Sequence, residues 1–230
     1  MSSSPFHPLG PAHYIPVDPD LRSVLRTSKR VGVFFATRQG HTQRIAERIT
    51  TDLLVLGFDV DLCDVRRPLL FSLSNYSAAV LAASVHAGSH EKEMVRFVKD
   101  HRSELERITT AFLSVTLSEA GAEMPDKTLA EHAQFALDVD RMLGKFFTET
   151  AWHPKLAKPV AGALLYTHYN FLVRLIMKRI ARKAGAATDA SRDYVYTDWV
   201  GLDKFVDDLA AEIRGAPATE TRSIVGSPIS

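Results

Sequence analysis

The chain has 230 residues, of which 46% are hydrophobic and 24% are charged, as in an ordinary soluble globular protein. The formal net charge of +1 gives no overall attraction for nucleic acid, so we expect no nucleic-acid partner. Cys63 is the only cysteine, which excludes an internal disulfide, a CxxC redox pair and a cysteine-based zinc site, and is compatible with a reducing cytoplasm. No run of apolar residues approaches the roughly 18 that a membrane-spanning helix needs.

Residues 30–214 predict one domain in which strand-like and helix-like segments alternate. In chain order, the patterns predict a strand at 31–37, a helix at 42–57, strands at 58–65 and 78–84, a helix at 91–105, a strand at 110–116, a helix at 128–147, a strand at 159–166 and a helix at 198–213. The proline-rich residues 1–29 predict an extended arm before this domain, and residues 215–230 predict a tail behind it.

The alternation indicates the fold class. Strands followed by helices of this length form βαβ units, which build a parallel sheet with helices on both faces. The run AAVLAAS at 78–84 is apolar throughout, as expected of a central strand. Five such strands are typical of a flavodoxin-like, doubly wound α/β fold with the strand order 2-1-3-4-5. Residues 167–197, before the last helix, do not fit the alternation and form an insert.

The turn after the first predicted strand is a candidate phosphate site. It consists of Thr37, Arg38, Gln39, Gly40, His41 and Thr42. In open α/β sheets, ligands bind at the carboxyl ends of strands where the strand order reverses, and the first strand ends at such a point. Backbone N–H groups at a helix start and two threonine hydroxyls suit a phosphate, and Gly40 permits close approach. Neither GxxxxGK[ST] nor GxGxxG is present, and the alternative is an ordinary turn with an N-capping threonine.

Two further loops follow the third and fourth predicted strands. The first consists of Ser84, Val85, His86, Ala87 and Gly88, and the second of Ser114, Val115, Thr116, Leu117 and Ser118. In this topology both loops lie at the same edge of the sheet as the first turn. An isoalloxazine ring needs such loops as side walls, so the three loops together predict a flavin site. Generic strand-to-helix loops are the alternative.

Five stretches of the sequence resemble the quinone-dependent protoporphyrinogen oxidase family of flavodoxin-like proteins. They are FFATRQGHTQRIAERI, VLAASVHAGSHEKEMVRFV, AFLSVTLS, VAGALLYTHYNFLVRLIMKRIA and YVYTDWVGLDKFV. The resemblance covers about residues 30–213, and VYTDW behind a basic insert is its most specific part. The chain departs from the family in its extra arm and in a loop, SVHAGSHEKE, that lacks the expected aromatic residues.

The resemblance implies a non-covalent FMN held by the three loops. It also implies the dehydrogenation of protoporphyrinogen IX to protoporphyrin IX in heme biosynthesis, with a membrane quinone as electron acceptor. We therefore expect a cytoplasmic protein at the inner face of the cytoplasmic membrane. A homodimer is one possible oligomeric state, and the sequence does not decide between it and a monomer. The alternatives are an FMN electron carrier or quinone reductase with another substrate, and a flavin-free interaction module.

The insert contains a basic segment, FLVRLIMKRIARKA, at 171–184. Its cations are Arg174, Lys178, Arg179, Arg182 and Lys183, and it has no acidic residue. Three of them recur every four residues and share a helical face, which is typical of a helix on an anionic membrane surface. The same cations could contact the propionates of a porphyrinogen. A helix packed on the domain with its basic face in solvent is the alternative.

His86 and His90 lie four residues apart with Glu93 nearby, but no third ligand has convincing spacing, so we expect no metal. His86 is more interesting as a hydrogen-bond donor or proton acceptor for substrate N–H groups, and an exposed loop histidine is the commoner alternative. No Ser-His-Asp or Cys-His arrangement can be argued from the spacing, and we assign no catalytic residue.

Overall fold

The computed structural model describes residues 29–68, 72–123, 125, 127–164, 191 and 193–215. The predicted arm, apart from Lys29, and the predicted tail, apart from Gly215, lie outside the described residues. So does most of the insert, including Arg174, Lys178, Arg179, Arg182 and Lys183. None of the described helices is both long enough and apolar enough to cross a membrane.

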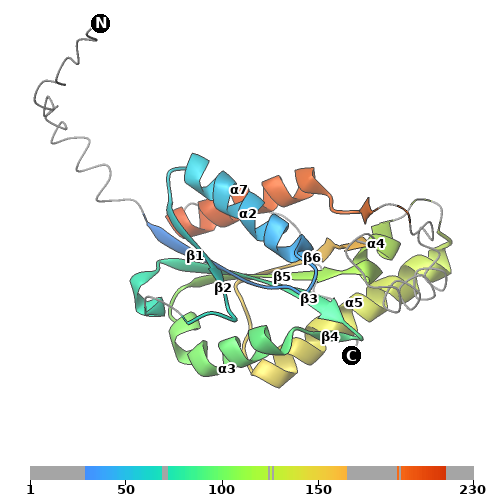
Figure 1. The fold of residues 1–230 in the computed structure, drawn as a ribbon, viewed down its shortest axis with the longest axis horizontal. Coiled ribbons are helices and arrows are strands. Elements are labelled where there is room, and N and C mark those ends of the chain that lie inside the picture. Colours follow the sequence, from blue (N-terminus) through green and yellow to red (C-terminus); the bar gives the residue numbers. More distant parts are fainter. Residues whose placement is uncertain are drawn as a thin grey trace, which may run out of the picture.

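A parallel sheet forms the centre of the domain, with its strands in the order β2-β1-β3-β5-β6 (Figure 1). The strands are β1 (Arg30–Ala36), β2 (Asp59–Asp64), β3 (Ala78–His86), β5 (Thr109–Thr116) and β6 (Leu156–Ala161). Every neighbouring pair along this path is parallel. Numbered as the sequence predicted them, these strands lie in the order 2-1-3-4-5, so the flavodoxin-like fold class is confirmed.

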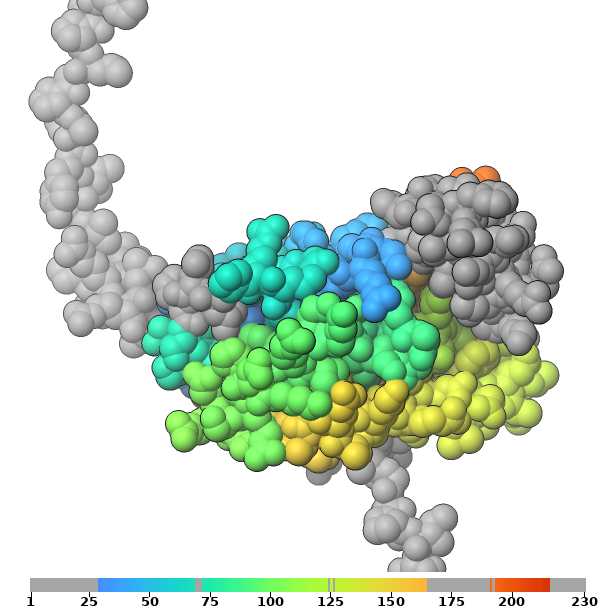
Figure 2. All heavy atoms as spheres, turned by 60° about the horizontal axis from the view of Figure 1, so that its bottom comes forward, coloured from blue at the N-terminus to red at the C-terminus, as the bar shows by residue number. Residues whose placement is uncertain are grey.

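Helices cover both faces of the sheet. One face carries α2 (His41–Val55) and α7 (Trp199–Arg214), and the other carries α3 (Lys92–Leu105) and α5 (Leu129–Thr150) (Figure 1). Figure 2 shows α3 and α5 side by side on the second face. The short elements are η1 (Leu73–Asn75), α4 (Leu117–Glu123), β4 (Ser89–His90), β7 (Ala163–Leu164) and β8 (Tyr194–Val195).

The side chains of β1 alternate between two hydrophobic cores. Val31, Val33 and Phe35 pack with α2 and α7, whereas Phe34 and Ala36 pack with α3 and α5. All five side chains are at most 5% exposed. A strand that is apolar on both faces must be covered on both faces, so polar ligands can approach it only at its ends.

Two predicted helix starts are confirmed by their capping hydrogen bonds. Thr128 Oγ1 accepts from the Glu131 N–H at 3.2 Å, and the Glu131 carboxylate accepts from the Thr128 N–H at 2.9 Å, which makes a capping box at the start of α5. Asp198 Oδ1 accepts from the Gly201 N–H at 3.0 Å and caps α7. The second cap fixes the chain next to Thr197, which contacts the candidate site.

The fifth strand differs from its predicted range, 159–166. β6 begins at Leu156 and ends at Ala161, after which β7 pairs antiparallel with β8 instead of continuing the main sheet. Pro159 lies inside β6 and not at its start, because an edge strand tolerates a residue that lacks an N–H. At Gly162 the N–H still donates to the carbonyl of Thr116 at 3.0 Å, which holds the departing chain against the end of β5.

Candidate functional site

A cavity lies at the carboxyl end of the sheet, where the predicted loops meet. Its walls come from the junction of β1 and α2, the end of β3, the junction of β5 and α4, and the chain between β6 and β7. The lining residues are Thr37, Gln39, His41, Thr42, Ser84, Val85, His86, Val115, Thr116, Leu117, Gly162 and Ala163. The structure therefore brings all three candidate loops together at one edge, as the topology predicted.

Several predicted site residues lie near the cavity without lining it. Arg38 and Gly40 belong to the first loop, and the Arg38 side chain donates to the Glu91 carboxylate. Ala87 and Gly88 are exposed. Ser114 is fully buried within β5, and Ser118 lies in α4.

The first loop turns sharply at Gly40, which is the N-cap residue of α2. Its φ of 85° and ψ of −10° lie in the left-handed region, which glycine adopts without a steric penalty. The Gly40 N–H donates to Thr37 Oγ1 at 3.1 Å, and its carbonyl accepts from the Arg44 N–H at 3.1 Å. The alternative of an N-capping threonine is wrong, because Thr42 lies inside the helix.

The start of α2 therefore has the properties of an anion site. Within the described part of the chain, no side chain caps this helix. The N–H groups of His41, Thr42 and Gln43 precede any intrahelical acceptor, and the positive end of the helix dipole adds to their effect. Helix starts of this kind bind phosphates.

His41 is buried, with 5% of its surface exposed, in the wall of the cavity. Its Nε2 is 2.7 Å from Thr197 Oγ1, whereas its Nδ1 is buried without a hydrogen-bond partner among the described residues. Burial, followed by the positive charge of Arg44, lowers the pKa of His41 to about 4. The ring is therefore neutral at pH 7.

The second candidate loop is the end of a β-hairpin. β3 continues to His86 and pairs antiparallel with β4, so that Val85 faces His90 and His86 faces Ser89. Ala87 and Gly88 form the turn with φ of 50° and 74°, as in two-residue hairpin turns. The prediction of a loop from Ser84 onward is therefore corrected: Ser84, Val85 and His86 are held by strand pairing, and only the tip is a turn.

A buried carboxylate that the sequence did not single out lies behind this hairpin. Glu91, 4% exposed, precedes α3 as its N-cap residue. Its Oε2 accepts from Arg38 Nε at 3.0 Å, and its Oε1 accepts from Ser84 Oγ at 3.0 Å. It thus joins the first loop to the second. In the sequence it looks like an ordinary acidic residue at a helix start, which is why no signal pointed to it.

His86 lies beside this carboxylate, with Nε2 at 3.2 Å from Glu91 Oε1. The two atoms are not aligned as a hydrogen bond. Burial lowers the pKa of His86 and the charge of Arg38 adds to this, whereas the Glu91 carboxylate opposes it. A neutral imidazole next to a carboxylate can accept a proton and have the resulting charge stabilised.

His90 faces the core and not the cavity. Its Nε2 is 2.9 Å from Ser114 Oγ, and its ring contacts the rings of Phe112 and Phe146. Burial, followed by the charge of Lys145, lowers the pKa of His90 to about 4. Across the described ranges, no group of three or more His, Cys, Asp and Glu side chains could hold a metal ion.

The third candidate loop is partly helical, which corrects the prediction of a loop at 114–118. Ser114, Val115 and Thr116 belong to β5, and Leu117 and Ser118 begin α4. Thr116 Oγ1 accepts from the Ser118 N–H at 3.1 Å and stabilises the turn between the two elements. A strand that passes into a helix without a loop holds this wall of the cavity in place.

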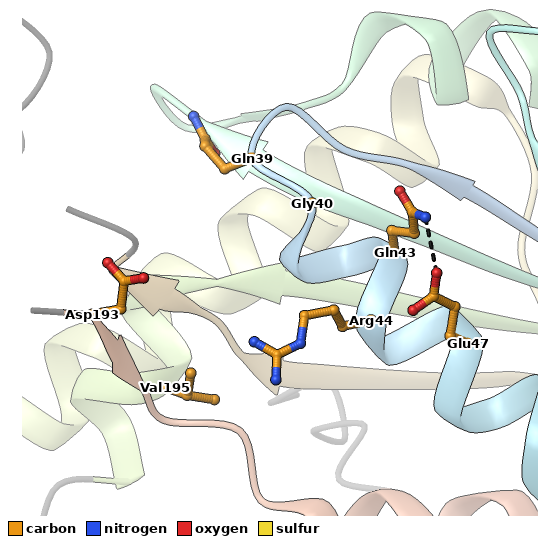
Figure 3. Close-up of a pocket in the computed structure, with 7 residues that line it drawn as sticks. All are labelled: Gln39, Gly40, Gln43, Arg44, Glu47, Asp193 and Val195. Carbon is orange, nitrogen blue, oxygen red and sulfur yellow. Dashed lines mark hydrogen bonds between the residues drawn. The ribbon is translucent and has the colours of Figure 1, made fainter. Parts of the chain in front are cut away.

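A second cavity also borders the first loop (Figure 3). Its lining residues are Gln39, Gly40, Gln43, Arg44, Glu47, Asp193 and Val195. Figure 3 shows Arg44 extending from α2 toward the chain that carries Asp193 and Val195, and Gln43 Nε2 donating to Glu47 Oε1 at 2.8 Å. This surface carries charges of both signs, so it has no clear preference for an anion.

Comparison with known proteins defines the class to which this fold and site belong. Residues 32–191 match the family model described as "Flavodoxin domain". A solved short-chain flavodoxin associated with a non-canonical PDU bacterial microcompartment aligns at 14% identity and a TM-score of 0.46, over 80% of this chain and 99% of that one. At that score the solved structure adds nothing to the fold assignment, which rests on the sheet and on the family model.

Curated relatives match at higher identity. The chain is 30% identical over 197 residues to a protein of Leishmania major named "Protoporphyrinogen IX dehydrogenase [quinone]", over 85% of this chain and 81% of that one. It is 32% identical over 178 residues to the protein of the same name from Escherichia coli (strain K12), over 77% of this chain and 93% of that one. The chain belongs to this flavodoxin-like family of oxidoreductases, as its sequence indicated.

A flavodoxin domain implies a flavin cofactor, and the residues of the first loop fit a flavin phosphate. The unsatisfied N–H groups of α2 and the hydroxyl-bearing Thr37 and Thr42 are donors that an anion needs. The space beside Gly40 is open, since a Cβ placed there would contact nothing within 4 Å. The end of β3 and the junction of β5 and α4 form two other walls of the cavity, where a ring system would be flanked.

The buried histidines predict how stability depends on pH. His41 and His90 have a pKa of about 4 in the folded protein and about 6.5 in the unfolded chain. Between these values the unfolded chain binds more protons at these two sites, so their contribution to the free energy of unfolding falls as the pH falls from 6.5 to 4. Each histidine contributes up to about 1.4 kcal/mol per pH unit. Urea denaturation at pH 7, 6 and 5 measures this slope.

The variant His90→Gln isolates one share of that effect, because glutamine can still bond to Ser114 but does not titrate. We expect its slope between pH 6 and 5 to be smaller than that of the natural chain by about 1 kcal/mol per pH unit. His153→Gln, at an exposed position, is the matched control and should leave the slope unchanged. Equal slopes for His90→Gln and the natural chain would contradict the assignment of a buried neutral His90.

Proposed function

We propose that the chain is an FMN-dependent dehydrogenase that oxidises protoporphyrinogen IX to protoporphyrin IX and passes the electrons to a quinone. One observation carries the proposal: three loops line a single cavity in a chain whose relatives of that name match over most of their length. The phosphate loop supports FMN as the particular flavin, because its donors suit a terminal phosphate monoester.

Most residues of the site would bind the cofactor, and one residue would transfer protons. The first loop would bind the phosphate, and the hairpin and α4 would flank the ring. Bound FMN supplies the acceptor for two electrons in each of three rounds. His86, neutral and beside the Glu91 carboxylate, is our candidate to hydrogen-bond the substrate N–H groups and take up the proton lost in each round.

A membrane quinone as acceptor would place the protein at the inner face of the cytoplasmic membrane. Five cations of the insert support this location, since each lysine or arginine near an anionic surface contributes about 1 kcal/mol. They lie outside the described residues, so this part of the proposal rests on the sequence alone.

A second candidate function keeps the cofactor but changes the substrate. The hairpin tip beside the cavity consists of Ala87 and Gly88 and offers no aromatic surface to a large flat ligand. This favours an FMN-dependent quinone reductase or electron carrier as the alternative to the porphyrinogen enzyme.

Anaerobic reduction separates these functions. The protein reconstituted with FMN is mixed with protoporphyrinogen IX, and the visible absorbance of the flavin is followed. We expect rapid bleaching, which then reverses when a quinone is added. A yellow protein that stays yellow with this substrate but is reduced by other donors would support the second candidate and contradict the first.

The phosphate loop is tested by removing its two hydroxyl groups. In the double variant Thr37→Val, Thr42→Val, we expect the Kd for FMN to rise at least about 100-fold, because two hydrogen bonds to a charged group are lost at about 1.5–3 kcal/mol each. Thr51→Val, an exposed position on the same helix, is the control. Fluorescence titration of FMN measures both, and an unchanged Kd in the double variant would refute the assignment.

Membrane contact is tested by charge reversal in the insert. The variant Arg174→Glu, Lys178→Glu, Arg182→Glu should lose most of its binding to vesicles of anionic phospholipid while keeping its FMN. Co-sedimentation with vesicles measures the binding, and neutral vesicles serve as the control. Undiminished binding of the variant to anionic vesicles would show that the insert does not make this contact.

A further inference from the structure

The hydrogen bonds around His41 determine which ring nitrogen carries the hydrogen. Thr197 has a single hydroxyl hydrogen, and it donates this hydrogen to the carbonyl of Ala161 at 2.7 Å. The same hydroxyl oxygen lies 2.7 Å from His41 Nε2, so it must accept a hydrogen from that nitrogen. The neutral ring therefore carries its hydrogen on Nε2, and Nδ1 is a bare acceptor.

An acceptor such as Nδ1, which has no hydrogen, is unfavourable next to a bound anion. Nδ1 is buried, finds no donor among the described residues, and belongs to a ring in the wall of the cavity that Thr37 and Thr42 also line. The backbone N–H groups and hydroxyls around it are the donors that a phosphate needs. A lone pair on Nδ1 would repel a phosphate oxygen, whereas a hydrogen on Nδ1 would make one more bond to it.

We propose that His41 takes up a proton on Nδ1 when the FMN phosphate binds, and that the imidazolium donates this hydrogen to a phosphate oxygen while Nε2 stays bonded to Thr197. The inference rests on the proposed binding of FMN. One proton passes from solvent to the ring, and no other bond forms or breaks. Cofactor binding and proton uptake are thereby coupled at one side chain.

The charges around the His41 ring agree with protonation that occurs only when phosphate binds. Without phosphate, burial and Arg44 on the same helix keep the ring neutral. Trp199 contributes only an aromatic edge from α7, with ring centroids 6.3 Å apart. The other described titratable groups of the two cavities are His86, Glu47 and Asp193. A phosphate dianion would then be the strongest charge next to His41, and it favours the protonated ring.

The pH dependence of FMN affinity follows from counting protons. The second pKa of a phosphate monoester is about 6. Above about pH 6 the free phosphate is a dianion and His41 is neutral, so binding takes up one proton and the Kd for FMN should rise about tenfold per pH unit. From about pH 4 to 6 the free phosphate already carries that proton, and the Kd should be nearly constant. A site made only of fixed donors would instead bind more tightly as the pH rises through 6.

Calorimetry counts the proton directly. The chain freed of flavin is titrated with FMN at pH 7.5 in buffers of different ionisation enthalpy, such as HEPES and Tris, without inorganic phosphate. We expect uptake of about one proton for the natural chain and for the control His153→Gln. His41→Gln keeps a hydrogen-bond donor but does not titrate, so we expect it to bind FMN with almost no proton uptake.

Nitrogen NMR of the histidine-labelled natural chain locates the proton without a variant. With FMN bound at pH 7.5, both ring nitrogens of His41 should carry hydrogen. Tight FMN binding without proton uptake, equal uptake by His41→Gln, or a neutral His41 ring in the complex would each overturn the inference and leave FMN binding intact. A chain that binds no FMN would overturn the proposed cofactor together with this inference.

Discussion

The start of α2 is the feature on which the rest of the site depends. The chain passes from the buried strand β1 into this helix through a single left-handed residue, Gly40, which leaves the first N–H groups of the helix unsatisfied. Those groups lie at the carboxyl end of the sheet, where the strand order reverses between β1 and β3. An anion bound there completes hydrogen bonds that the protein alone leaves open.

Buried polar contacts hold the other walls of the cavity in position relative to this helix start. Glu91 bonds to Arg38 of the first loop and to Ser84 at the end of β3, which fixes the spacing between the two. On the opposite side, the bonds from His41 to Thr197 and from Thr197 to Ala161 link α2 to the end of β6. Each contact joins segments far apart in the sequence, so the site forms only when the whole domain has folded.

The sequence predicted much of this arrangement because the relevant signals are local. Periodicity identified the strands and helices, and the rules of parallel sheets then determined the strand order and the edge at which Thr37, Ser84 and Thr116 meet. The helix start at Asp198 could be predicted because an aspartate at the N-cap position is a local signal, whereas the helix behind Thr128 was predicted from its pattern alone and its capping box was not.

The features that the sequence did not predict depend on contacts between distant segments. The hairpin of β3 and β4 turns at Ala87 and Gly88, and alanine is not a residue that signals such a turn. The short helix α4 has little intrinsic stability and packs against α5. The burial of Glu91 requires Arg38, which lies 53 residues earlier in the chain. Patterns within a short window contain no information about such partners.

We propose that the helix start at Gly40 binds the phosphate of the cofactor. The most direct test compares the affinities of FMN and riboflavin, which differ only in that phosphate, for the flavin-free protein at pH 6. A phosphate held by several backbone and hydroxyl donors predicts that FMN binds at least about 100-fold more tightly, given about 1.5–3 kcal/mol for each hydrogen bond to a charged group. Equal affinities for the two flavins would contradict the claim, since the ring would then bind without any help from this loop.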